Sequence, residues 1–439
     1  MKLRLLFVSL ILTTAAIQAQ EVAYEEYDLD NGLHVILHQD NSAPVVTTSV
    51  MYHVGAKDED PSKTGFAHFF EHLLFEGTQN IERGEWFKIV SSNGGQNNAN
   101  TTQDRTYYYE VFPSNNLELG LWLESERLMH PIINQIGVDT QKEVVQEERR
   151  MRYDNAPYRR WQEQMGVNLF KKHPYRWQTI GSLEHLASAS LEDFQNFNKT
   201  YYVPNNAVLV VAGDIDLQDT KKMVKEYFGP IPKGSDIKRT RIIEDPITKT
   251  IKASYNDSNI QIPAIFAGYR TPKNTDRDAY ILDMISTYLS DGNSSKLYKK
   301  LVDEEKKALQ VFAFNITQED YGTYIIGALP LGEATLQDLL IEIDEEIVKI
   351  QNELISEKDY QKIQNKFENQ FVNSNSSISG IANSLARYHM LYGDTSLINN
   401  EIEIYRSITR EEIQAAAKKY LNPNQRVELE YLPGEQTGK

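Results

Sequence analysis

One stretch of the chain, from Gly65 to Phe75, is almost entirely apolar yet carries two histidines and a glutamate. Its apolar residues cover every face of a helix, so the pattern predicts a buried helix. Burying a carboxylate between two imidazoles is costly unless something pairs with them. His68 and His72 are four residues apart and project from one face, next to Glu71. A lone core histidine is usually structural, but three polar residues at these spacings predict a metal site.

Other apolar runs predict the remaining elements of the first part of the chain. The predicted strands are Val22–Tyr27, Leu33–His38, Val45–Val54, Asn98–Val111 and Ala207–Ala212, the first two joined by a hairpin turn. The predicted helices are Leu117–Met129, Val138–Arg152 and Leu217–Phe228. Thr64 is predicted to cap the helix that carries His68, and Gly77 is predicted to end it.

The chain also repeats itself. Residues Glu192–Val208 match residues Glu411–Val427 at a constant offset of 219 positions without a gap. This repeat indicates duplication, with the polar segment Lys233–Pro246 as the linker. We therefore expect an α+β fold of two homologous halves, each a mainly antiparallel sheet packed with helices. The predicted domains are 21–232, which binds the metal, and 247–439, which is homologous and of an inactive type.

Composition and charge limit the cellular location of the protein and the kinds of molecule that it binds. The net charge is −16, and this acidic balance argues against a nucleic-acid partner. Residues 1–20 have a basic start and a short apolar core, which predicts a signal peptide and export to the periplasm or beyond. The apolar core is too short to span a bilayer, and no other segment is long and apolar enough. An uncleaved signal acting as a tether is the alternative. The absence of cysteine excludes disulfides and a lipoprotein anchor.

A third metal ligand is expected from an acid-rich helix that offers Glu143, Glu147 and Glu148. Periodicity places Glu148 on the same stripe as Val145 and Gln141, facing inward, and turns the other two carboxylates outward. A charged helix usually carries only solvated charges, and that reading is the alternative. A zinc site needs a third protein ligand besides the two histidines, which favours Glu148.

These residues resemble the pitrilysin/insulinase family of zinc metallopeptidases, the inverzincins, in its half-length, processing-peptidase-like bacterial branch. Gly65–Thr78 matches the family's H-x-x-E-H zinc helix, and Glu148 lies at the family's spacing for the third ligand. The resemblance implies one Zn²⁺ per chain, held by His68, His72 and Glu148, with Glu71 as the general base. It also implies that the substrate, an extended peptide or unfolded polypeptide, adds as a strand.

Further segments support the resemblance. They include the run around Asn98 and Ala99, which the family places against the substrate, and segments that match the end of its first domain and parts of its second: His173–Tyr175, Tyr202, Pro204–Asn206, Gly213–Asp214, Gly268–Pro272 and Ser294–Tyr298. Without the family, a polar loop around Asn98 is an equal alternative.

The sequence departs from the family at two places. Gln141 stands where many relatives carry a glutamate that supports the metal ligands, so it can hydrogen-bond near the metal but adds no charge. Val302 and Leu309 replace an Arg/Tyr pair that orients the substrate and stabilises the oxyanion in active single-chain relatives. Neither side chain can donate a hydrogen bond.

The missing pair leaves two explanations open. The first is a heterodimer with a homologous subunit that supplies the Arg and the Tyr. The second is a weaker enzyme that uses other donors, such as Lys306, Lys307 or Tyr298. Two other function classes remain as rivals to a zinc endopeptidase: a non-catalytic structural or peptide-binding subunit on the same fold, and a metal-binding protein without hydrolysis.

Overall fold

The computed structural model describes residues 21–434, so the predicted signal peptide lies outside the described residues. The first of two sheets has six strands in the order β1-β2-β6-β3-β5-β4. Only β2 and β6 run parallel; the other neighbours are antiparallel. The strands are β1 (Glu25–Asp28), β2 (His34–Gln39), β3 (Val45–Tyr52), β4 (Gln96–Thr101), β5 (Thr106–Pro113) and β6 (Ala207–Gly213).

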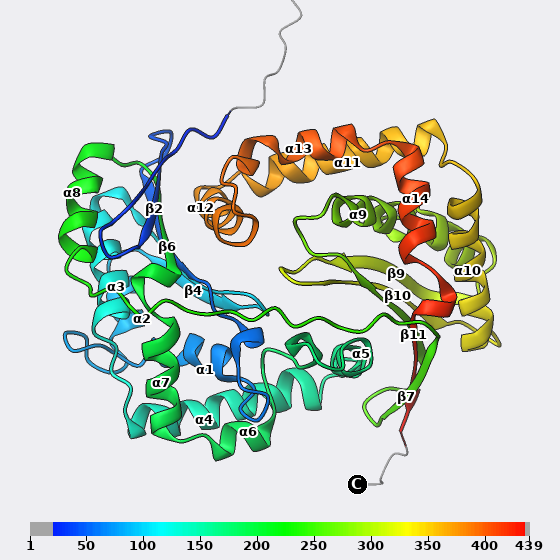
Figure 1. The fold of residues 1–439 in the computed structure, drawn as a ribbon, viewed down its shortest axis with the longest axis horizontal. Helices are drawn as coiled ribbons and strands as arrows, with labels where there is room; N and C mark the ends of the chain where they lie inside the picture. The colour runs from blue at the N-terminus through cyan, green and yellow to red at the C-terminus, as the bar shows by residue number, and fades with distance from the viewer. Residues whose placement is uncertain (1–20, 435–439) are drawn as a thin grey trace, which may run out of the picture.

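The second sheet has five strands in the order β7-β11-β8-β10-β9. Its strands are β7 (Ile251–Asp257), β8 (Ala264–Thr271), β9 (Ala308–Ile316), β10 (Gly322–Pro330) and β11 (Val427–Pro433). Again only one pair, β7 with β11, is parallel. The order is that of the first sheet without β1, so the expected fold of two homologous, mainly antiparallel halves is confirmed (Figure 1).

The sequence repeat corresponds to the same structural unit in both halves. Helices α7 (Leu191–Tyr201) and α14 (Arg410–Tyr420) begin 219 positions apart, and each leads into the strand that pairs in parallel. Both begin with a capping box, Ser190 with Asp193 and Thr409 with Glu412. Such a box satisfies the free amides of a first helical turn in both copies.

Helices cover both faces of the first sheet. The remaining helices of the first half are α1 (Phe66–Leu73), α2 (Trp86–Ser92), α3 (Leu117–Met129), α4 (Gln135–Arg149), α5 (Trp161–Leu169), α6 (Leu183–Ser188) and α8 (Leu217–Phe228). Those of the second half are α9 (Arg277–Ser290), α10 (Leu336–Asn352), α11 (Glu357–Ser374), α12 (Ile378–Arg387) and α13 (Leu397–Ser407). Side chains of α1, α3, α7 and α8 form one core with the first sheet.

The two halves pack together because one helix of each half covers the sheet of the other half. Helix α12 of the second half packs on β3 and β6, and its Ile381 and Leu385 share a core with Ile36 and Val210. Helix α5 of the first half packs on β7, β8 and β11 in the same way. Figure 1 shows α12 against the first sheet and α5 beside β11. The halves therefore bury apolar surface jointly.

Several predicted boundaries are wrong. The segment predicted as one strand, 98–111, is two strands, because Thr102 and Arg105 close a turn between β4 and β5. Helix α1 begins after Gly65, whose positive φ of 99° suits glycine, and not after a Thr64 cap. The Thr64 hydroxyl instead contacts His185 Nδ1 at 2.8 Å. The helix ends at Leu73, before Gly77.

Helix boundaries elsewhere vary in the same way. Helices α3 and α8 have the predicted bounds, whereas α4 begins three residues before the predicted Val138, because Asn134 caps it by accepting a hydrogen bond from the amide of Gly137. Helix α2 was not predicted. Across residues 21–434, no helix has both the length and the apolar character required to cross a membrane.

Candidate metal centre

Helix α1 is fixed by aromatic packing on its buried side. Phe66 and Phe69 both stack on Phe194 of α7, with ring centroids 4.6 and 4.4 Å apart. The main-chain carbonyl of Phe70 accepts a hydrogen bond from the Tyr108 hydroxyl of β5. Because apolar side chains hold these positions, the opposite side of the helix directs its polar residues towards α4 and β4.

Three of the predicted side chains come together on that side. Glu148 Oε2 lies 3.2 Å from His72 Nε2 and 3.7 Å from His68 Nε2. One ligand atom from each residue lies within 4.8 Å of the other two, and all three residues are partly buried. Tetrahedral zinc with bonds of about 2.0–2.1 Å separates its ligand atoms by about 3.3 Å. The spacing in the structure therefore fits such an ion.

The Glu148 carboxylate is held at both oxygens. Arg152, one helical turn later, pairs with Oε1 at 2.8 Å, which leaves Oε2 towards the histidines. Burial acts to raise the pKa of Glu148, but the hydrogen bond with His72 and the charges of His68, His72 and Arg152 together hold it below the usual value. The group is thus an ionised carboxylate. Glu143 and Glu147 are exposed.

The environment of His68 favours the neutral imidazole. Burial, followed by the charge of His72, lowers the pKa of His68 to about 4. A metal ligand must be the neutral ring, so this environment suits ligation. The other ring nitrogen, Nδ1, is buried and has no hydrogen-bond partner among the described residues. Two imidazoles and one carboxylate are a donor set typical of catalytic zinc.

Glu71 lies beside the three residues but bonds elsewhere. Its Oε2 accepts a hydrogen bond of 2.6 Å from the Thr101 hydroxyl at the end of β4. Burial raises the pKa of Glu71, while the Thr101 bond and the charge of His72 act against the rise. Arg105, in the turn after β4, is close enough to Glu71 for its positive charge to lower the pKa of Glu71 as well. The Glu71 carboxylate is thus oriented by β4 and not by the triad of His68, His72 and Glu148.

The strand that positions Glu71 is the edge of the first sheet. Within residues 21–434, β4 pairs only with β5. Asn98 is exposed and Ala99 is largely buried, and the main-chain amide of Ala99 donates to the Asn98 side-chain oxygen at 2.9 Å. Both residues therefore lie on an open sheet edge next to the glutamate. A peptide strand can add to such an edge.

The remaining predicted residues lie farther from the triad. Gln141 donates to Glu76 Oε1 at 2.6 Å, and no hydrogen bond to the triad is seen for it. Val302 packs against the core of the second half, and Leu309 is exposed. Lys307 pairs with Glu305 and with Glu342 of α10, so its charge is engaged within the second half.

A buried arginine supports the end of α1, and sequence reasoning missed it. The Arg127 guanidinium donates to the carbonyl of Leu74 at 3.2 Å and pairs with Glu110 and Glu124. All three charged side chains are fully buried. The guanidinium also stacks near the rings of Phe75, Trp86 and Tyr108. The sequence of α3 does not single out Arg127, because the helix carries three glutamates as well.

The chain is similar to known proteins over most of its length. Residues 34–182 match the family model described as insulinase (peptidase family M16), and residues 188–367 match the model described as the peptidase M16 inactive domain. A zinc protease PqqE from Helicobacter pylori is 30% identical over 402 residues, which cover 90% of this chain and 88% of that protein. An uncharacterized zinc protease YmxG from Bacillus subtilis is 23% identical, covering 90% and 95%.

Solved structures agree. A protease from H. pylori is similar with a TM-score of 0.89 and 27% identity, covering 94% of this chain and all of that chain. The first half of the periplasmic protease PqqL from Escherichia coli has a TM-score of 0.76 at 18% identity, a likeness of fold. The two family models and the PqqE relative show that this chain belongs to the insulinase family of peptidases, family M16.

Proposed function

We propose that this chain is a zinc endopeptidase that hydrolyses extended peptides or unfolded polypeptides. The observation that carries the proposal is the convergence of His68, His72 and Glu148 beside an oriented Glu71. In this proposal the triad holds one Zn²⁺ per chain. Zinc, when bound, supplies a Lewis acid that polarises a carbonyl and lowers the pKa of water.

Glu71 takes the role of general base in this proposal. Its carboxylate is set by Thr101 at 2.6 Å and lies next to the site where water is activated. It accepts the proton of the attacking water and returns it to the leaving amine. Arg152 keeps one oxygen of Glu148 directed away, so the other oxygen faces the histidines. Gln141 donates to Glu76 and adds no charge to the site.

The substrate binds, in this proposal, as an added strand along β4, next to Asn98 and Ala99. Main-chain pairing provides affinity without strong side-chain selection, which suits unfolded chains. The amide of Ala99, now bonded to the Asn98 side chain, is one donor that a substrate carbonyl can take over. Thr101 of β4 donates a hydrogen bond to Glu71, so a substrate strand that pairs with β4 passes beside Glu71.

Residues 1–20 direct export in this proposal. The zinc domain is 21–232, and the inactive-type domain is 247–439.

A homologous second subunit supplies the Arg/Tyr pair that Val302 and Leu309 replace. The periplasmic protease PqqL from E. coli supports such a pairing of subunits, because 95% of this chain aligns with 48% of the PqqL chain, with a TM-score of 0.77. The rival proposal, a non-catalytic subunit, is favoured by the same two replacements.

The experiment measures cleavage of a fluorogenic peptide by the mature chain, alone and mixed with a homologous chain that carries the Arg/Tyr pair. We expect weak zinc-dependent cleavage alone and an increase of about 10²–10³-fold in the mixture, since one oxyanion donor contributes about that much. Full activity of the chain alone would reject the heterodimer. No cleavage in either sample, with zinc bound, would favour the non-catalytic subunit.

A further inference from the structure

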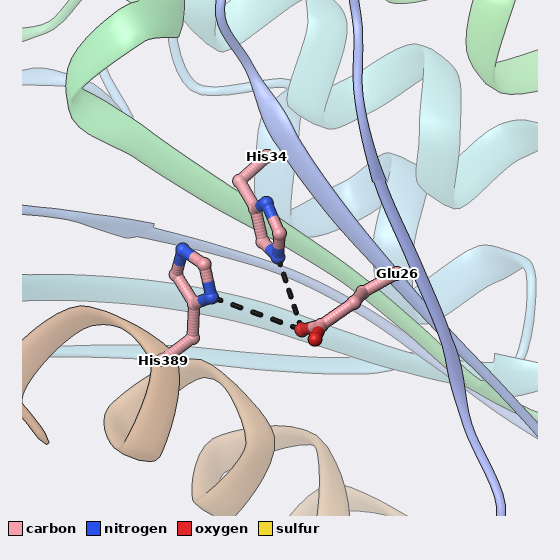
Figure 2. A group of neighbouring side chains, drawn as sticks. All are labelled: Glu26, His34 and His389. Carbon is pink, nitrogen blue, oxygen red and sulfur yellow. Dashed lines mark hydrogen bonds and ion pairs between the residues drawn. The ribbon is translucent and has the colours of Figure 1, made fainter. Parts of the chain in front are cut away.

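A second cluster of metal-binding side chains lies far from α1, where the two halves meet. Glu26 belongs to β1 and His34 to β2, the hairpin at the edge of the first sheet. His389 belongs to the turn of π-helix that follows α12 in the second half. Figure 2 shows the two imidazole rings side by side, with one nitrogen of each directed at the Glu26 carboxylate.

The distances in this cluster resemble those of the triad. Glu26 Oε2 lies 3.3 Å from His34 Nε2 and 3.8 Å from His389 Nδ1. One ligand atom from each residue lies within 4.8 Å of the other two. Two imidazoles and one carboxylate therefore converge here as well. Zinc and similar transition metals prefer this donor set.

The hydrogen bonds around the cluster fix the orientation of its side chains. Asp28 Oδ1 lies 2.8 Å from His34 Nδ1, so in the neutral ring that nitrogen carries the proton and Nε2 presents its lone pair to Glu26. The hydroxyl of Thr395 donates to Glu26 Oε2 at 2.7 Å, and its oxygen lies 3.3 Å from His389 Nδ1. A metal ion on Nδ1 therefore replaces this contact with Thr395. Either a proton on Nε2 or a metal ion fills the position between this nitrogen and the Glu26 carboxylate, and a carboxylate on the far nitrogen is the usual support of a metal-binding histidine.

We propose that Glu26, His34 and His389 form a second divalent-cation site, which takes Zn²⁺ and fastens the β1–β2 hairpin to the segment after α12. The rings are stacked, with centroids 3.5 Å apart and planes 13° from parallel. Lone pairs of parallel rings do not converge, so binding turns one ring out of the stack. The second site is therefore weaker than the triad, and it joins residues 26 and 34 to residue 389 across the two halves.

The test measures zinc binding to the metal-free mature chain by calorimetry and by metal analysis. We expect two equivalents for the wild type, one tight and one weak. His389→Ala and Glu26→Gln each remove only the weak one. Asp28→Asn weakens the second equivalent about tenfold or more, the usual effect of losing such a support. His130→Ala, which removes a histidine outside both clusters, keeps both equivalents.

A double variant separates this proposal from the proposed function. His68→Ala/His72→Ala is expected to lose the tight equivalent and keep the weak one, whether or not the chain is a peptidase. Added zinc is also expected to raise the melting temperature of that variant, because a ligand that binds only the folded state stabilises it. A single equivalent in the wild type, or two equivalents in both His389→Ala and Glu26→Gln, would overturn the proposal.

Discussion

The two halves place an acid in the same architectural position but in opposite chemical surroundings. In the first half, Glu71 of α1 is hydrogen-bonded by Thr101 of the edge strand β4. In the second half, Asp283 of α9 is hydrogen-bonded by Asn315 of the edge strand β9 and by Tyr405. Burial raises the pKa of Asp283 to about 7.

The two acids differ in the side chains that surround them. Glu71 has two histidines on its own helix and Glu148 across from it, whereas α9 carries no histidine. The cavity beside Asp283 is lined by tyrosines and by Arg387 and Glu401. The same framework therefore carries the proposed metal site in one half, whereas most of the other half matches the model of the peptidase M16 inactive domain. The comparison shows that the chemistry depends on a few side chains, and that the sheet and helix only position them.

The largest expected effect comes from changing the two acids in turn. Glu71→Gln is expected to lower kcat by about 10²–10⁴-fold, because it removes the general base, while zinc stays bound. Asp283→Asn is the matched control and is expected to leave peptide cleavage near the wild-type rate. Cleavage assays and zinc analysis of both variants check this. Equal losses in the two variants would mean that the halves do not differ as described.

The buried arginines provide a second comparison. Arg127→Met leaves Glu110 and Glu124 buried without their cation, and a loss of about 3–5 kcal/mol of unfolding free energy is expected. Arg426 of the second half pairs with Asp344, which is 29% exposed, so Arg426→Met is expected to cost less. Denaturant melts of both variants measure the difference. A greater loss for Arg426→Met would contradict the explanation from burial.

Stability should also depend on pH through the second half. The pKa of Asp283 is raised to about 7, above the ordinary value of about 3.9. Between these values the folded chain keeps a proton that the unfolded chain releases, so this group makes stability fall as pH rises from 4 to 7. Asp283→Asn is expected to remove that fall. Parallel melting-temperature profiles of variant and wild type would argue against it.

The smallest expected effect concerns the bond that orients Glu71. Thr101→Val removes a hydroxyl and keeps the shape of the strand, so a loss of about fivefold in kcat/KM is expected, the value of one ordinary hydrogen bond. Zinc content should not change. Thr106→Val, at the start of β5, removes a hydroxyl bonded to the carbonyl of Val54 and tests whether any such loss on this sheet has the same effect.

The sequence predicted those parts of the fold and site that depend on local pattern. Helix α1 follows from apolar residues around His68 and His72, and Glu148 follows from the stripe of α4. The duplication was visible because Glu192–Val208 and Glu411–Val427 match without a gap at a constant offset of 219 residues. The family expectation was confirmed by the comparisons.

Other features depend on contacts between distant segments, and the sequence could not predict them. The sequence does not reveal that α5 packs on the second sheet and α12 on the first, because an amphipathic helix does not indicate which sheet it covers. The turn between β4 and β5 contains neither glycine nor proline and is stabilised by Thr102. Thr101 and Arg127 act through tertiary contacts, whereas Arg152 pairs with Glu148 one helical turn away. The cluster of Glu26, His34 and His389 spans both halves and has no local motif.

The central claim is that the first half holds a metal ion and the second half has no counterpart of that site. An anomalous difference map from crystals of the zinc-loaded chain, collected at the zinc edge, tests it most directly. We predict a strong peak within bonding distance of His68 Nε2, His72 Nε2 and Glu148, and none beside Asp283. A map with no peak between those three side chains would contradict the account.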